Sequence, residues 1–242
     1  AGIVFVLGLW HVVTVYGLVS DVVAASPMET VGVYFEFTDL ILSAFVSTTL
    51  KTLWGFGAAL FLALVLGSVF ALSDRIYEAL MPLMVSINSV PRVALAPLII
   101  FYVGGEDTAK YVIAAWVAFF PMFLNVVEGL DATGTDEFNL FRSFGATGWQ
   151  TYRKLRIPNS LPHVFDGLKI GISLAMVGAV VGEFVQGNKG IGALVIAAMG
   201  QLQMHVVFAA VGIISIAAVI VVLLVFVVQD RLIYWTDTEL FT

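Results

Sequence analysis

The sequence has no cysteine and few charged residues, and both absences narrow what the protein can be. Without cysteine the chain can form no disulfide, no thiolate nucleophile and no thiolate metal site. Charged residues make up only 12% of the 242 residues, against roughly 25% in ordinary soluble domains. A soluble protein of this length needs a charged surface that this chain cannot supply. The composition therefore excludes a water-soluble enzyme.

Other features of metal, catalytic and nucleic-acid sites are also missing. The three histidines, His11, His163 and His205, lie too far apart in sequence to suggest a metal site. The chain has no H-E-x-x-H and no G-x-S-x-G motif, so we expect no catalytic residues. The net charge of −6 disfavours nucleic-acid binding, which needs cationic side chains to neutralise phosphates.

Apolar residues, in contrast, make up 60% of the chain, and the mean hydropathy is +1.02. A membrane-spanning helix needs about 20 mostly apolar residues, because it rises about 1.5 Å per residue through roughly 30 Å of hydrocarbon. Six stretches qualify: about 1–19, 42–72, 80–103, 108–127, 163–185 and 205–228. We therefore predict an all-α membrane protein with about six transmembrane helices.

The third of these stretches contains Pro82, Pro91 and Pro97. Proline removes a backbone donor and clashes with the preceding helical turn, so it bends or breaks a helix. We do not expect one straight helix there.

The basic residues of the loops indicate the orientation, since cytoplasmic loops retain lysine and arginine. If the first helix runs outward, six basic loop residues are cytoplasmic and only Lys189 lies on the opposite side. The six are Arg75, Arg142, Arg153, Lys154, Arg156 and Arg231. This count predicts that both termini are cytoplasmic.

Small residues recur at helical spacing in the second and fifth stretches. Such rows let two helix backbones approach closely in lipid, where the hydrophobic effect does not drive helices together. We predict that they are helix-packing positions: Gly55, Ala59, Ala63, Gly67, Gly167, Gly171, Gly178 and Gly182.

The segment 128–162 mixes acids, bases and aromatic residues in a chain that otherwise avoids charge. Its aromatic residues keep helical spacing on both sides of the sequence Gly-Ala-Thr-Gly at 145–148, which predicts two short helices hinged at glycine. Ile157-Pro158 is expected to end the second. Such a pair suits docking to a cytosolic protein, or lying on lipid headgroups.

The spacing of residues in this segment resembles a known signature. Gly145, nine intervening residues and then Leu155-x-Ile157-Pro158 resemble the EAA loop of permease subunits of bacterial ABC importers, with pattern E-A-A-x3-G-x9-I-x-L-P. The sequence Asn-Leu-Phe at 139–141 replaces E-A-A. Further blocks between Pro91 and Gly190 are similar to the nitrate, sulfonate, taurine and pyrimidine-precursor branch of this family.

The resemblance implies a type I importer-like fold, with 1–242 as one transmembrane permease domain and 128–162 as its cytoplasmic coupling loop. It also implies a bacterial inner-membrane location and, as partners, a second permease copy in a homodimer, two cytosolic ATPase subunits and an extracytoplasmic substrate-binding protein. The chain lacks the phosphate-binding G-x-x-x-x-G-K-[ST] loop. We therefore expect this chain to bind no cofactor, and the partner ATPase to use ATP and Mg.

The resemblance places the contact with the ATPase subunit in the coupling loop. The expected contact residues are Phe144, Gly145, Ala146, Trp149, Leu155, Ile157 and Pro158. The transported solute is expected to be small and polar: a sulfonate such as taurine, nitrate or a thiamine-type pyrimidine precursor.

Polar residues at membrane depth are candidates for the translocation path, since burying a charge there costs several kcal/mol. The candidates are Asn88, Arg92 and Glu183. Two of them have a simpler interpretation: Arg92 as an arginine that is paired structurally or reaches along its helix to water, and Glu183 as a solvated interfacial carboxylate, which we favour. We expect Lys51 to reach along its helix to water, and 191–199 to re-enter the membrane as a gate.

An ion-gradient-driven secondary transporter is the alternative function. It would normally show inverted repeats and several intramembrane acids. A single candidate acid, Glu183, makes this alternative the weaker one.

Overall fold

The computed structural model describes residues 2–17, 20, 23–105 and 107–233, and in these ranges all regular structure is helical. In chain order the elements are α1 (Gly2–Val15), α2 (Pro27–Glu36), α3 (Thr38–Leu72), α4 (Asp74–Asn88), η1 (Arg92–Leu95), α5 (Ala96–Val103), α6 (Thr108–Asp131), α7 (Thr135–Ser143), α8 (Gly148–Thr151), η2 (Tyr152–Arg156), α9 (Ile157–Val185), α10 (Ile191–Gly200) and α11 (Met204–Leu232). The short element η1 is a 3-10 helix, and η2 is one π-helical turn.

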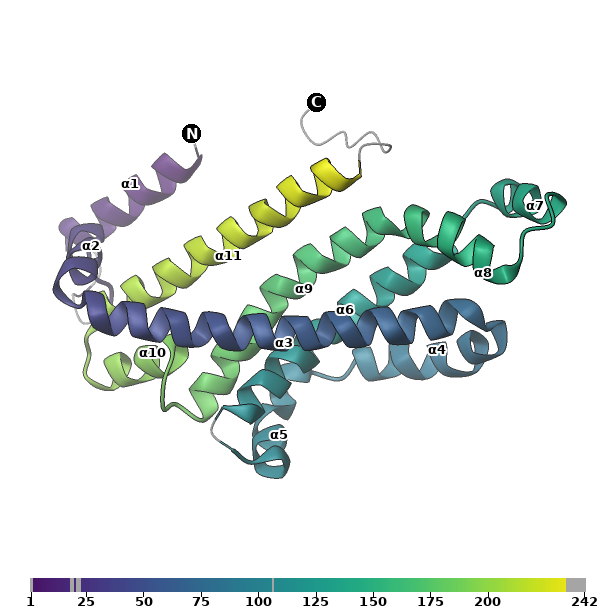
Figure 1. The fold of residues 1–242 in the computed structure, drawn as a ribbon. Helices are drawn as coiled ribbons and strands as arrows, with labels where there is room; N and C mark the ends of the chain where they lie inside the picture. Colours follow the sequence, from purple (N-terminus) through teal and green to yellow (C-terminus); the bar gives the residue numbers. More distant parts are fainter. Residues whose placement is uncertain (1, 18–19, 21–22, 106, 234–242) are drawn as a thin grey trace.

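Helix α6 is the centre of the bundle, with α3 and α9 packed against it (Figure 1). In the most apolar stretch of α6, 56% of the residues are buried inside the protein. In the corresponding stretch of α11, none is buried. The core contains Phe119, Phe120 and Phe123 of α6 together with Phe70 of α3 and Ala175 of α9. The outer surface of α11 is left for lipid or for another chain.

The two rows of small residues are buried, and their glycines face α6. A Cβ atom on Gly55 of α3 would lie 2.4 Å from the Cβ of Ala114, and one on Gly178 of α9 would lie 2.8 Å from the Cα of the same alanine. These distances are shorter than real Cβ contacts. Helices α3 and α9 therefore both approach α6 closely, through positions that have no room for a side chain.

The six-span count is not confirmed. Four helical runs among the described residues are long and apolar enough to cross a membrane: α3, α6, the run Gly148–Val185 and α11. Helices α4 and α5 make a fifth span only as a pair bent by 82°. The break before Pro91 confirms that the proline-rich stretch is not one straight helix.

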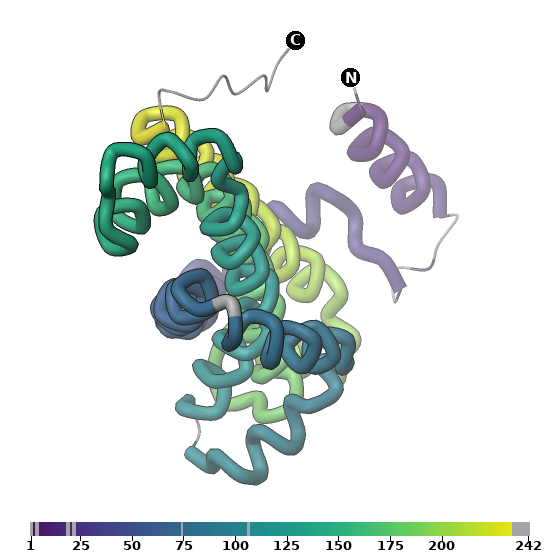
Figure 2. Tube along the Cα trace, turned by 90° about the vertical axis from the view of Figure 1, so that its right-hand side faces the viewer, coloured from purple at the N-terminus to yellow at the C-terminus, as the bar shows by residue number. Residues whose placement is uncertain are grey.

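Helix α1, the first expected span, has 14 residues and lies at the side of the bundle (Figure 2). Its Trp10 ring stacks on Phe208 of α11 at 5.5 Å, and the indole nitrogen donates to the Ala25 carbonyl at 3.1 Å. The helix is therefore joined to α11 through one aromatic contact.

The bundle has two distinct ends (Figure 1). Helices α7 and α8 lie at one end, where α3 finishes and α4 begins, and α2 and α10 lie at the other. Five of the six basic residues predicted to be cytoplasmic belong to α4, α7 and η2, at the end of the bundle that carries α7 and α8. Lys189 lies at the end that carries α10.

Candidate functional site

The first candidate site is the hinged segment, residues 135–156, which comprises α7, the turn after it, α8 and η2. Helix α7 ends at Ser143, and Gly145, two residues later, adopts the left-handed region with φ +72°. The Ala146 amide donates to the Phe141 carbonyl at 3.1 Å, and the Gly145 amide donates to the Arg142 carbonyl at 3.0 Å. This is the Schellman pattern of helix termination, which places glycine at the left-handed position. The predicted break between two helices at Gly145 is confirmed.

A capping box then begins α8: the Thr147 hydroxyl accepts from the Gln150 amide at 3.3 Å, and the Thr147 amide donates to the Gln150 side chain at 2.8 Å. The expectation that Pro158 ends this helix is wrong, because α8 runs through η2 into α9 as one helix from Gly148 to Val185. Proline has no amide hydrogen for the preceding turn. The π turn absorbs this defect, with the Ile157 amide donating to the Tyr152 carbonyl five residues back.

Two side chains of η2 attach the hinged segment to the end of α3. The Tyr152 hydroxyl donates to the Ser68 hydroxyl at 2.7 Å, and the Arg156 guanidinium donates to the Ala71 carbonyl. Arg156 also lies over the Phe138 ring of α7, 5.7 Å from its centroid. Positive charge at the carboxyl end of α3 is favourable, since unpaired carbonyls gather there.

A pocket of about 400 Å³ remains between the hinged segment and the end of α3. Its lining includes Arg142, Thr151 and Arg156. Helix α7 is also joined to the start of α9. There the Asn159 amide group donates to the Glu137 carboxylate at 2.9 Å. Helix α7, which has no buried residues, is thus attached at a few polar contacts, whereas Tyr152 of η2 belongs to the hydrophobic core.

The predicted ATPase-contact residues divide into exposed and buried groups. The side chains of Phe144 and Trp149 are 81% and 63% exposed, which leaves two aromatic rings open to a partner. Leu155 is only 8% exposed, because it lies on the buried side of η2, which packs against α6. It cannot contact a partner in this conformation. The other four are exposed or half-buried: Gly145, Ala146, Ile157 and Pro158.

Of the predicted path residues, Arg92 lies at the break between α4 and α5. Its guanidinium donates to the Val117 carbonyl of α6 at 3.2 Å. In a regular helix that carbonyl would accept from residue 121, but Pro121 has no amide hydrogen. Arg92 thus supplies the donor that Pro121 lacks, as the structural interpretation of this arginine requires.

Asn88 is the last residue of α4 and is half-buried. Its side-chain oxygen is buried without a hydrogen-bond partner among the described residues. Asn88 and Arg92 therefore lie on either side of the same helix break.

Glu183, expected to be solvated, is instead fully buried, with 0% exposure. Its carboxylate accepts from the Lys51 ammonium at 2.8 Å and from the Thr48 hydroxyl at 2.9 and 3.0 Å. The Gly192 amide donates to it at 2.9 Å. The expectation that Lys51 reaches water is also wrong, since Lys51 is 2% exposed and paired with Glu183. Excluding both charges from water is tolerable only because each is neutralised and hydrogen-bonded by the other and by its neighbours.

The network continues into the backbone that precedes α10. The Ile191 amide donates to the Thr48 hydroxyl at 2.7 Å, and the Lys51 ammonium donates to the Lys189 carbonyl at 2.8 Å. We call Thr48, Lys51, Glu183 and the backbone of 189–192 the Glu183 network. It joins α3, α9 and the start of α10, which is the segment expected to act as a gate.

Asp107 lies between the charged residues of the Glu183 network and the protein surface. Its carboxylate is 3.9 Å from the Lys51 ammonium and 3.4 Å from that of Lys110, a fully buried residue at the start of α6. The Asp107 side chain is 55% exposed. The buried cations at this end of the bundle therefore have one carboxylate inside the protein and one at its surface.

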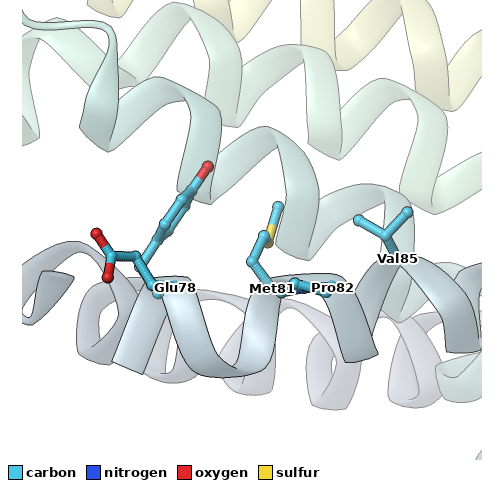
Figure 3. A pocket seen from close by; sticks show the side chains of 5 residues that line it. Glu78, Met81, Pro82 and Val85 are labelled. Carbon is cyan, nitrogen blue, oxygen red and sulfur yellow. The ribbon is translucent and has the colours of Figure 1, made fainter. Parts of the chain in front are cut away.

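A pocket of about 520 Å³ along α4 does not share these polar features (Figure 3). Its lining, Tyr77, Glu78, Met81, Pro82 and Val85, comes from one face of one helix. Binding sites for polar solutes need several converging polar groups, and Glu78 is the one charged residue of this lining. The groove is suited to lipid chains or an apolar helix.

Comparison with known proteins agrees with this architecture. Residues 55–240 match the model of the family described as the binding-protein-dependent transport system inner membrane component. The chain is 32% identical over 199 residues to the formylaminopyrimidine transport permease protein ThiX of Halalkalibacterium halodurans, covering 81% of this chain and 78% of that protein. It is 34% identical over 158 residues to the riboflavin transport system permease protein RibX of Chloroflexus aurantiacus, covering 65% and 59%.

Among solved structures, the chain is similar in fold to the inward-facing MetNI methionine ABC transporter. The TM-score is 0.66 at 19% identity, over 81% of this chain and 95% of that chain. The family match covers most of the sequence, including the hinged segment, Glu183 and the backbone of 189–192, whereas Thr48 and Lys51 precede it. The chain therefore belongs to the family of inner membrane components of binding-protein-dependent transport systems.

Proposed function

We propose that this chain forms the membrane passage of an ATP-driven importer, as one of two identical permease copies. Two cytosolic ATPase subunits would bind the hinged segment, and an extracytoplasmic protein would deliver the solute to the opposite end. ATP and Mg belong to the ATPase subunits in this proposal, and 1–242 acts as a single permease domain with both termini in the cytoplasm. Family membership argues against the ion-gradient-driven alternative.

The observation that carries the docking proposal is the exposure of Phe144 and Trp149 on either side of the glycine turn. Large aromatic residues on a short helical segment are typical anchors for a groove on a partner, because burying them removes much apolar surface from water. They belong to a segment that carries Arg142, Arg153 and Lys154, which supports a cytoplasmic position. The alternative occupant of this surface is the lipid headgroup layer.

The docking proposal is tested by replacing the most exposed ring. Phe144→Ala should weaken binding of the purified ATPase subunit to the detergent-solubilised permease by at least about tenfold, a typical loss for an anchoring aromatic residue. The matched control is Phe35→Ala, since Phe35 is also 81% exposed but lies in α2 at the opposite end of the bundle. Equal binding by the two variants would contradict the docking site and favour the lipid surface.

A second test addresses coupling rather than affinity. Gly145→Asp should leave the bundle folded, because aspartate tolerates the left-handed region better than most residues. It should place a charged side chain in the docking surface and uncouple ATP hydrolysis from transport. Solute-stimulated ATPase activity of the reconstituted transporter is the measurement. Survival of that stimulation in Gly145→Asp would show that the turn is not the docking point.

For the solute we propose a small polar molecule, with a thiamine-type pyrimidine precursor as the first candidate and sulfonates, taurine or nitrate as the others. The names of the two relatives, which refer to formylaminopyrimidine and riboflavin, support a nitrogen heterocycle. The partner binding protein selects the solute in this proposal. Purifying that protein and identifying its bound ligand by mass spectrometry tests the choice, and a sulfonate or nitrate would overturn it.

A further inference from the structure

The Glu183 network uses every strong hydrogen-bonding group that it buries. The Lys51 ammonium has three hydrogens, and it donates to the Ser47 hydroxyl, the Glu183 carboxylate and the Lys189 carbonyl, each at 2.8 Å. The Thr48 hydroxyl donates to Glu183 and accepts from the Ile191 amide. A buried polar network satisfied in this way has one favourable geometry, since any displacement leaves a charged group unpaired.

The chain before α10 is shaped around the carboxylate of Glu183. Gly190 has φ +120°, and a Cβ atom there would lie 1.9 Å from the Glu183 Oε1 atom. A Cβ atom on Gly192 would lie 2.8 Å from the Glu183 Cβ atom. Glycine at both positions lets the backbone wrap closely around the side chain and present the amides of Ile191 and Gly192 to the network.

The burial of Glu183 removes it from direct contact with a solute. Its side chain is 0% exposed, and its acceptor positions are occupied by Lys51, Thr48 and the Gly192 amide. Apolar side chains would fill the same space without the cost of burying two charges, so stability alone gives little reason for an ion pair here. What the pair provides is a fixed position for the first turn of α10 relative to α3 and α9.

We propose that Glu183 is a positioning residue that holds the first turn of α10 on α3 and α9 throughout the transport cycle. Helix α10 then moves together with these two helices and does not open as an independent flap at residues 189–192. This inference rests on the proposed transport function. In this proposal Glu183 does not contact the solute, and it affects transport by fixing the position of α10.

The test compares hydrogen exchange of the peptide covering 189–194 in the reconstituted transporter without nucleotide and with ATP and vanadate. We expect slow exchange of the Ile191 and Gly192 amides in both states, because both stay bonded to buried side chains. Fast exchange in either state of the unaltered protein would show that the network opens during the cycle and would overturn the proposal.

Variants separate this role from general stability. Thr48→Val removes the hydroxyl that joins Glu183 to Ile191, and Thr52→Val is its matched control. Thr52 is equally buried on α3, one turn further on, but its hydroxyl donates only to the Thr48 carbonyl of its own helix. Thr48→Val should speed exchange of the Ile191 amide at least about tenfold and raise the ATP hydrolysed per solute transported, whereas Thr52→Val should change neither.

Thr48→Ser keeps the hydroxyl and should restore both values. Glu183→Gln should give the larger effect, since it removes the buried counter-charge of Lys51, and Thr48→Val carries the test if Glu183→Gln fails to fold. Equal effects of Thr48→Val and Thr52→Val would overturn the inference. Absence of ATP-dependent uptake by the unaltered transporter would instead contradict the proposed function, so the two failures are distinguishable.

Discussion

At the scale of single residues, Pro121 and Arg92 show how one missing hydrogen determines the role of a distant side chain. The Val117 carbonyl has no helical donor because Pro121 lacks an amide hydrogen, and the Arg92 guanidinium takes that place. An arginine at membrane depth is expensive. Here part of that cost is offset by a carbonyl that would otherwise remain unpaired.

This arrangement predicts that Arg92 and Pro121 are energetically coupled. Arg92→Ala should destabilise the protein by about 1–3 kcal/mol, because it leaves the Val117 carbonyl without a donor. In a Pro121→Ala background the helix supplies its own amide, and the same change should cost clearly less. Thermal unfolding of the four proteins in detergent measures the cycle. If Arg92→Ala lowered the free energy of unfolding equally in the two backgrounds, the bond from Arg92 to the Val117 carbonyl would contribute nothing to stability. If Arg92→Ala abolished solute uptake in both backgrounds, a role of Arg92 in the translocation path would be favoured.

Gly190 gives a second prediction at this scale. Gly190→Ala should lower stability by about 2–5 kcal/mol, because the new methyl group meets the Glu183 carboxylate and because φ +120° strains any residue other than glycine. Gly200→Ala is the control, since Gly200 has open space around it at the other end of α10. The unfolding temperature of Gly190→Ala should be lower than that of Gly200→Ala. Similar values would show that the backbone around residue 190 adjusts to a side chain easily.

At the scale of elements, the sequence predicts helices well where a physical signal is local. The glycine hinge, the rows of small residues and the proline break could each be found from spacing and residue type alone. The continuation of α8 into α9 could not, because the π turn that tolerates Pro158 is a backbone adjustment with no sequence signal of its own. The pairing of Lys51 with Glu183 was missed because 132 residues separate them, and only the packing of α3 and α9 brings them together.

The packing of elements gives a further prediction. Gly55→Ala should destabilise the bundle by about 1–3 kcal/mol, because its methyl group would overlap Ala114 of α6. Gly57→Ala, two residues along the same helix, has nothing within 4 Å of its new methyl group and should be neutral or slightly stabilising. Unfolding temperatures in detergent measure both, and no difference between them would argue against close packing of α3 on α6.

The stability of the first turn of α2 should depend on pH. The Ser26 amide and hydroxyl donate to the Glu29 carboxylate at 2.8 and 2.9 Å, and these bonds lower the pKa of Glu29. Because the folded pKa is lowered, the stabilisation is complete above the ordinary pKa and is lost as pH falls through the lowered value. The unfolding temperature of the unaltered protein should therefore exceed that of Glu29→Gln at neutral pH and approach it in acid. A constant difference would contradict this assignment.

At the scale of the whole molecule, the distribution of basic residues predicts which end faces the cytoplasm. The chain has no cysteine, so a single cysteine reports its own location. In intact cells, an impermeant maleimide should label Gly200→Cys at the α10 end and should not label Ala146→Cys at the hinged segment. In inside-out vesicles the result should reverse. The opposite pattern would overturn the orientation that the loop charges predict.

The unbroken helix from Gly148 to Val185 has a mechanical consequence. At 1.5 Å per residue its 38 residues extend for about 57 Å. Trp149 lies near its first turn and Glu183 near its last. A displacement of α8 by a bound subunit would therefore travel along one continuous helix to the buried ion pair, past local irregularities at the π turn and at Pro162. Force applied on one side of the bilayer would reach the other without crossing a loop.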